Sequence, residues 1–498
     1  MNFNSLEFLI FLVVVLLLYW LIPHKFRWVI LLVASLYFYM SWNPPLVFLM
    51  LGTMIVSYGA ALAISKTKKK AWKKFWMIMA LVVCLGVLIF FKYFEFFLNS
   101  AVDFLNLFSM NLDSFSLNLL LPIGISFYTF QTLSYVIDVY RGDFEAEKHF
   151  GYYALFVCYF PQLVAGPIER PGDLLPQLKQ PHKFNRDDFI TGFRILIIGF
   201  YYKCVVADFC GVYVNNVFNN LDSANGLAIV IGSLLFCVQI YCDFVGYSEI
   251  ATGAARMMGV KLTRNFNRPY LATSFTDLFR RWHLTLTRWF TDYVYIPLGG
   301  NRKGKARKLL NILIVFVLCG LWHGANWTYV LWGLYCAFLM MLENILKKPT
   351  DNFFIKRGID PKGSTINGCR RALMFVLYVF SAIIFRSTSI EQVGIMLGKL
   401  FTEWGVGEAF FNATMDSLGL NMITILQLVM CILCLIQLFD FGEIGRDANS
   451  KPLATLRQDQ GAEIRSLSIH IYTIAIIALS WLLIIATQDS SAFLYFQF

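Results

Sequence analysis

Residues 309–346 read LLNILIVFVLCGLWHGANWTYVLWGLYCAFLMMLENIL and indicate a membrane protein. A helix that crosses a bilayer needs about 20 mainly apolar residues, so this block is nearly two spans long. Gly320 and Gly324 interrupt the block, and His323 stands between them. The block therefore predicts helices at membrane depth, with a break at a histidine.

The rest of the chain is patterned in the same way. Hydrophobic residues form 58% of the 498 residues and charged residues only 15%, whereas soluble chains carry about 25% charge. We predict one all-α polytopic membrane domain over residues 1–498, with about 11 transmembrane helices plus re-entrant or interfacial helices. The expected spans lie near 5–22, 27–42, 45–64, 75–98, 117–139, 189–206, 226–258, 309–346, 371–387, 422–440 and 467–487.

The net charge of +11 does not indicate a nucleic-acid partner. The basic residues lie between the apolar blocks, and the densest run, 65–74, joins two of them. This is the pattern of cytoplasmic loops under the positive-inside bias. It predicts that both termini are extracytoplasmic. Most of the eleven cysteines fall inside apolar blocks, so we expect buried thiols and no metal site.

Two segments do not fit a simple span. Residues 150–168 are apolar but contain Pro161 and the pair Gly166-Pro167, which predicts a re-entrant or interfacial element. Residues 274–292 are amphipathic, with Ser274 as a plausible helix start and Trp and Arg on opposite faces. The second segment predicts one interfacial helix.

His323 is the strongest candidate for chemistry. It lies about 20 Å beyond the basic loop if the intervening residues are helical. An ionisable group at that depth marks a functional site unless neighbouring helices satisfy it. The flanking glycines would let a substrate chain approach closely, and Asn326 is a weaker candidate for orienting His323 or for donating to a carbonyl oxygen.

His283 is the second candidate, because it lies on the edge of the apolar stripe of 274–292 and can point into the protein. An interfacial anchor is the other reading of this residue. Asp243 stands among small residues in 241–257, which predicts tight helix packing around polar groups and a supporting or cavity-lining role.

At this point the sequence resembles a known family, the membrane-bound O-acyltransferases, and within it the alginate O-acetyltransferase type of bacterial envelopes. The similarity covers most of 120–335, treated as the family core, and the C-terminus, whereas 336–498 holds further spans and the tail. It rests on GISFYTFQTLSYVIDVYRG (124–142), FPQLVAGPIER (160–170), CDFVGYSEIATGAARMMG (242–259), NFNRPYLATSFTDLFRRWHLTLTRWFTDYVYIPLGGNRKG (265–304), GLWHGANWTYVLWG (320–333) and the terminal FLYFQF.

The resemblance implies helices around a funnel, His323 as the catalytic residue and His283 as a second functional position. It implies transfer of an acyl group, most simply acetyl, from a cytoplasmic thioester for O-acylation of an extracellular polysaccharide or envelope polymer. No bound cofactor is expected. The donor would be acetyl-CoA or an acyl carrier protein, which Arg302, Lys303 and Lys305 would attract, although positive-inside topology explains that loop equally well.

The expected partners are membrane lipids and an extracytoplasmic acetyltransferase or polymer-synthesis complex in a bacterial cell membrane. Two alternatives stay open. One is a D-alanyl transferase acting on teichoic acid, and the other is a non-catalytic transporter of an acylated intermediate. A transporter would be expected to show an internal repeat and carboxylates near the midplane.

The C-terminal residues QDSSAFLYFQF follow the last expected span closely and are rich in aromatics. They are too apolar for a solvated tail, so we expect them to bury themselves in the funnel or to anchor at the membrane interface. In the first case the phenol of Tyr495 would be a hydroxyl nucleophile that a histidine activates, and Tyr495 would act as an acyl relay.

Overall fold

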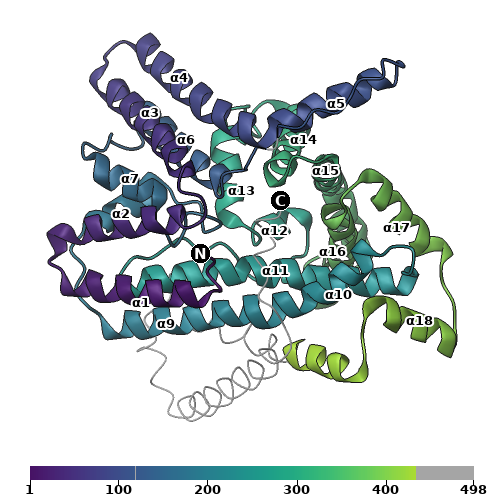
Figure 1. Cartoon of the computed structure of the whole chain (residues 1–498). Coiled ribbons are helices and arrows are strands. Elements are labelled where there is room, and N and C mark those ends of the chain that lie inside the picture. Colours follow the sequence, from purple (N-terminus) through teal and green to yellow (C-terminus); the bar gives the residue numbers. More distant parts are fainter. Residues whose placement is uncertain (118, 433–498) are drawn as a thin grey trace.

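The computed structural model describes residues 1–117 and 119–432. Within these residues the secondary structure is helical, and no strand occurs. Figure 1 shows long helices arranged around a middle region that holds the short helices α12 (Phe275–Phe279) and α13 (Leu284–Phe290). The prediction of an all-α polytopic protein is confirmed for this part of the chain.

The remaining α-helices follow the chain order shown in Figure 1. They are α1 (Leu6–Leu21), α2 (His24–Met40), α3 (Leu46–Lys66), α4 (Lys70–Leu88), α5 (Phe94–Asn106), α6 (Ile125–Arg141), α7 (Phe150–Cys158), α8 (Pro171–Lys179), α9 (Arg186–Phe200), α10 (Asp208–Asn219), α11 (Gly226–Met257), α14 (Gly304–His323), α15 (Trp327–Lys356), α16 (Ser364–Arg386), α17 (Ile390–Thr402) and α18 (Glu408–Leu418). Wider π-helical turns join α4 to α5 at Ile89–Tyr93 and α9 to α10 at Tyr201–Ala207.

Seven helices of the described residues, or eight if a bent pair counts as one, are long and apolar enough to cross a membrane. They are Leu46–Lys66, Lys70–Asn106, Arg186–Asn219, Gly226–Met257, Gly304–His323, Trp327–Lys356 and Ser364–Arg386, with Glu408–Leu418 and Met422–Ile432 as the bent pair.

This number is lower than the prediction of about 11 spans. Helices α1, α2 and α6 have only 16, 17 and 17 residues. Most side chains of α6 are buried inside the protein, so its apolar character serves packing. The expected span 467–487 lies outside the described residues, and 422–440 lies only partly within them.

The segment 150–168 is confirmed as something other than a full span. Helix α7 has nine residues, too few to cross, and the chain then continues as a buried irregular turn. Its backbone N–H groups find partners inside the protein: Phe160 N donates to Ser35 Oγ at 3.0 Å and Ile168 N to Thr285 Oγ1 at 3.1 Å. Irregular backbone at membrane depth is stable only with such partners.

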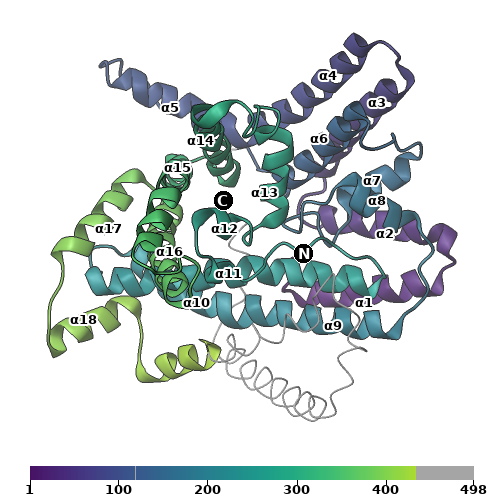
Figure 2. The same ribbon diagram turned by 180° about the vertical axis from the view of Figure 1, so that it is seen from behind.

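Helices α9 and α11 lie side by side in both views (Figures 1 and 2) and pack without intervening side chains at two levels. A Cβ added at Gly253 would lie 2.6 Å from Gly192 O, and one added at Gly246 would lie 2.9 Å from Gly199 O. Small residues allow this close approach of membrane helices. The predicted tight packing around 241–257 is confirmed.

A buried ion group lies next to this contact, where the π-helical turn Tyr201–Ala207 and the start of α10 meet α11. Lys203 Nζ is 2.8 Å from Asp243 Oδ1 and 2.7 Å from Asp208 Oδ1, and the Lys203 side chain is 1% exposed. Opposite charges that are paired in this way can be kept inside an apolar protein. The carboxylate of Asp243 therefore joins helices.

Helices α14 and α15 form a hairpin whose contact also depends on glycine. A Cβ at Gly320 would lie 2.2 Å from Tyr329 O, and one at Gly333 would lie 2.4 Å from Phe316 O. At Gly324 an added Cβ would meet the ring of Tyr329 at 2.2 Å. The expectation that these glycines leave room for a substrate chain is therefore wrong at Gly320 and Gly324, because α15 already occupies the space.

The prediction of one continuous helix over 274–292 is also wrong. Ser274 does start a helix, since its side chain accepts from Asp277 N, but α12 ends at Phe279. The chain then passes through His283 with φ +46° before α13 begins. Residues 265–267 supply the backbone partners at this break: Asn267 N donates to Arg281 O at 2.8 Å, and Leu284 N donates to Asn265 O at 2.9 Å.

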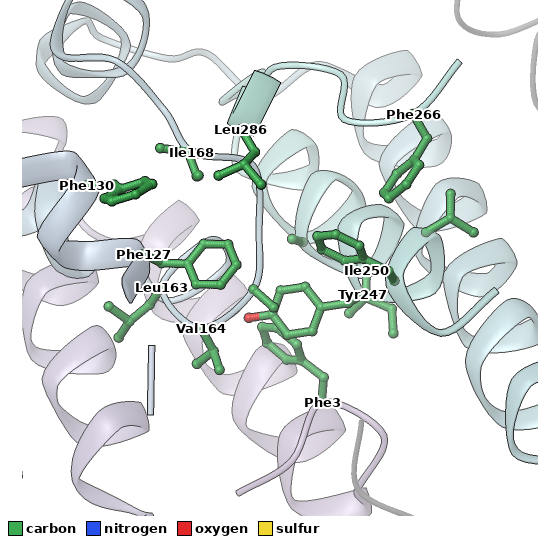
Figure 3. Packing of buried hydrophobic residues seen from close by; sticks show 14 of the residues in the cluster. Phe3, Phe127, Phe130, Leu163, Val164, Ile168, Tyr247, Ile250, Phe266 and Leu286 are labelled. Carbon is green, nitrogen blue, oxygen red and sulfur yellow. The ribbon is translucent and has the colours of Figure 1, made fainter. Parts of the chain in front are cut away.

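A compact aromatic cluster supports this break from the inside. Figure 3 shows Phe127 of α6, Val164 of the irregular turn and Tyr247 of α11 directed into one buried cluster. Phe3 closes it from the N-terminus, with its ring centroid 4.6 Å from that of Tyr247. Phe127 also lies near the imidazole of His283: the two ring planes are close to parallel and their centroids are 6.4 Å apart.

Candidate active site

His323 is the last residue of α14, and its side chain ends in an aromatic cage. The residue is 8% exposed. Its ring makes edge contacts with Trp322, Trp332 and Phe385 at centroid distances of 5.1, 5.2 and 5.2 Å. Cys319, one turn earlier, places its Sγ 3.9 Å from His323 Nε2. His323 is thus buried among apolar groups, at the end of a helix that is long and apolar enough to cross a membrane.

His283 is buried as well, at 2% exposure. Its Nδ1 lies 3.0 Å from Asn265 Oδ1. Thr285 N and Thr285 Oγ1 both donate to that same oxygen, at 3.4 and 2.9 Å, which identifies it as the acceptor end of the amide. An amide oxygen only accepts, so Nδ1 carries the hydrogen and the lone pair of His283 is at Nε2.

Trp322 connects the two histidines. Its ring centroid lies 5.1 Å from that of His323 and 5.7 Å from that of His283. Phe244 of α11 closes the far side of His283 at 4.6 Å. Burial lowers the pKa of His283 well below its usual range, and the neighbouring His323 adds to this effect. His283 is therefore a neutral imidazole with a free lone pair, the form that accepts a proton or a hydrogen bond.

The remaining predicted site residues are Asn326, Asp243 and Tyr495. The amide of Asn326 caps α15: Oδ1 accepts from Thr328 N at 3.0 Å and Nδ2 donates to Thr388 O at 2.9 Å. Its role at His323 or at a carbonyl oxygen stays a prediction. Asp243 contacts Lys203 and not a histidine in the bonds described above. Tyr495 lies outside the described residues, so its relay role stays a prediction.

The basic residues Arg302, Lys303 and Lys305 are exposed around the start of α14, at the end of the helix opposite His323. A helix of 20 residues spans about 30 Å, so these charges and the imidazole lie far apart along α14.

Two residues of the site were missed in the sequence. Asn265 fixes His283 from 18 positions away, and no local pattern marks such a contact. Lys92 contacts the end of α14 through its ammonium group. It is a lone lysine in the expected span 75–98, and this charge within an apolar block was a signal that could have identified it.

A multi-pass helical protein with two buried imidazoles among aromatic side chains is suited to proton transfer at a membrane-embedded centre. The family model described as MBOAT, membrane-bound O-acyltransferase family, matches residues 146–385, which include both histidines. The chain belongs to this family and is an O-acyltransferase.

Among its relatives, a probable alginate O-acetylase of Pseudomonas putida is 35% identical over the full length of both chains. A peptidoglycan O-acetyltransferase of Helicobacter pylori is 35% identical over 65% of each chain. A teichoic acid D-alanyltransferase of Bacillus subtilis is 29% identical over 46% of this chain and 61% of its own.

Proposed function

We propose that this O-acyltransferase takes an acetyl group from a thioester donor on the cytoplasmic side and serves the O-acetylation of a polysaccharide outside the membrane. The name of the full-length relative and that of the relative matched over 65% of each chain support acetyl as the group and a polysaccharide as the acceptor. The observation that carries the proposal is the pair of buried imidazoles on either side of Trp322.

We assign the proton transfers of the acyl-transfer reaction to His323. The acceptor hydroxyl attacks the thioester carbonyl, and His323 takes its proton as the O–C bond forms. The C–S bond then breaks, and the proton passes from His323 to the leaving thiolate. General base catalysis of this kind contributes on the order of 10²–10⁴ in rate.

His283 has a different task in this scheme. Asn265 fixes its lone pair at Nε2, so His283 can accept a hydrogen bond from an O–H or N–H group of a substrate and orient it. The aromatic side chains around both rings exclude water, which strengthens these polar contacts.

The donor would be acetyl-CoA or an acyl carrier protein that approaches the exposed Arg302, Lys303 and Lys305. Both donors carry negative charge, and charge attraction raises the rate of encounter. On the other face we propose an extracytoplasmic acetyltransferase or polymer-synthesis complex as the partner that receives the group.

The test is the His323→Ala variant in a strain that lacks the wild-type gene. We expect loss of polymer acetylation with unchanged protein level and membrane insertion. His24→Ala, a histidine at the start of α2 and outside the cage, is the matched control and should keep normal acetyl content. Wild-type acetyl content in the His323→Ala strain would refute the proposed mechanism.

A further inference from the structure

The last turn of α14 ends inside the protein, beside the site. The final carbonyl groups of any helix lack partners within the helix and need donors from elsewhere. In α14 these carbonyls belong to the residues that lead to His323. Whatever binds them also fixes the place from which the imidazole extends.

Two adjacent side chains of another span provide these donors. Tyr93 Oη donates to Leu321 O at 2.8 Å. Lys92 Nζ donates to Trp322 O at 2.7 Å and to His323 O at 3.3 Å. Three consecutive carbonyls at the end of α14 are therefore bound by a pair of residues about 230 positions earlier in the chain.

Lys92 and Tyr93 both lie in the π-helical turn Ile89–Tyr93 of the span Lys70–Asn106. Such turns are rare breaks in α-helices and often occur at functional sites. Here the π-helical turn contains the two residues that contact α14. The irregular turn in the span Lys70–Asn106 therefore lies where that span supports the end of the helix that carries His323.

The ammonium group of Lys92 is unusual because its contacts are neutral. Besides the two carbonyls, it lies 3.5 Å from Ser126 Oγ of α6. Within residues 1–117 and 119–432 no carboxylate forms an ion pair with it, unlike Lys203, which has two. The end of a helix carries partial negative charge, which a cation at that place stabilises.

We propose that Lys92 is the positioning residue of His323: its ammonium group holds the terminal carbonyls of α14 and so sets the direction of the imidazole. This inference rests on the proposed role of His323 in acyl transfer. Beyond His323 the chain leaves the helix in an extended conformation at Gly324, so the helix holds the histidine from one side only. Without Lys92 the last turn of α14 loses two of its three bound carbonyls and becomes free to shift.

The test compares Lys92→Met with Lys74→Met in purified protein supplied with a thioester donor. Methionine keeps much of the apolar stem and removes the charge. Lys74 lies on the same span but is exposed, so its variant loses the same charge away from the site. We expect kcat to fall on the order of 10²-fold in Lys92→Met, since a misplacement of about 1 Å has that effect. KM should stay within about twofold of the Lys74→Met value, because substrate contacts remain.

Tyr93→Phe removes the hydroxyl that donates to Leu321 O and keeps the aromatic ring. It should lower kcat by a factor of about 2 to 10, the usual weight of one hydrogen bond. If Lys92→Met does not fold, this variant decides: wild-type kcat in Tyr93→Phe would then overturn the proposal.

Wild-type kcat in a folded Lys92→Met protein would also overturn it, as would a change in KM alone. These outcomes can be told apart from failure of the proposed function. That failure would appear as an active His323→Ala enzyme, whereas a wrong inference about Lys92 leaves His323→Ala inactive and Lys92→Met active.

Discussion

Replacing Gly320 by alanine should move α14 away from α15 and lower the rate of acyl transfer without changing a histidine. The added Cβ would lie 2.2 Å from Tyr329 O and 3.0 Å from Tyr329 C, whereas ordinary contact begins at 3.4 Å. The obstacle is backbone, which cannot rotate away, so the helices must move apart by about 1 Å at this level. Overpacking of this kind costs about 1–3 kcal/mol of stability.

The activity should respond more strongly than the stability. Gly320 is three residues before His323 on the same helix, so the shift is passed to the imidazole, and a displacement of about 1 Å lowers rates on the order of 10²-fold. The assay is transfer from a thioester donor by the detergent-purified variant, with its melting temperature measured in parallel. Gly86→Ala on α4 is the matched control, because a Cβ there meets no atom within 4 Å. Wild-type kcat in Gly320→Ala would refute the argument that helix spacing positions the site.

Three further predictions concern the second histidine, the tail and the topology. In Asn265→Asp, a carboxylate beside Nδ1 should raise the pKa of His283. Because His283 acts as a neutral group, the acidic limb of the rate–pH profile should move to higher pH, and an unmoved profile would contradict the assigned hydrogen bond. Tyr495→Phe should abolish polymer acetylation if the phenol relays the acyl group, and undiminished acetylation would leave direct transfer instead. Cysteine labelling in intact cells should reach a probe at Ser490 and miss one at Lys69, and the reverse pattern would invert the proposed orientation.

The sequence predicted the apolar helix that leads to His323, because such a helix follows from the length of an apolar block. It also predicted an inward-facing His283, since one side of residues 274–292 is apolar. Both results depend on local composition and periodicity, which a single chain displays directly.

The parts that sequence reasoning missed depend on contacts between distant segments. The break at His283 exists because residues 265–267 supply its hydrogen bonds, and the helical pattern continues across it unchanged. The glycines around His323 were assigned to a substrate, although their free space is filled by Tyr329 of the next helix. Lys92 is visible in the sequence as a charge within an apolar span. Its contact with Trp322 O, 230 residues away, forms only in the folded protein and cannot be predicted from the local sequence.

The ion group of Lys203, Asp208 and Asp243 has a consequence for how the protein enters its membrane. Lys203 and Asp208 lie on one continuous helix, so their charges can pair as soon as that helix has formed. Asp243 arrives on the next helix, and an isolated aspartate at a membrane-helix centre costs about 2.5–3.5 kcal/mol to insert. We therefore expect the Arg186–Asn219 span to remain beside the insertion machinery until Gly226–Met257 joins it, so that the two enter the lipid as a glycine-packed hairpin.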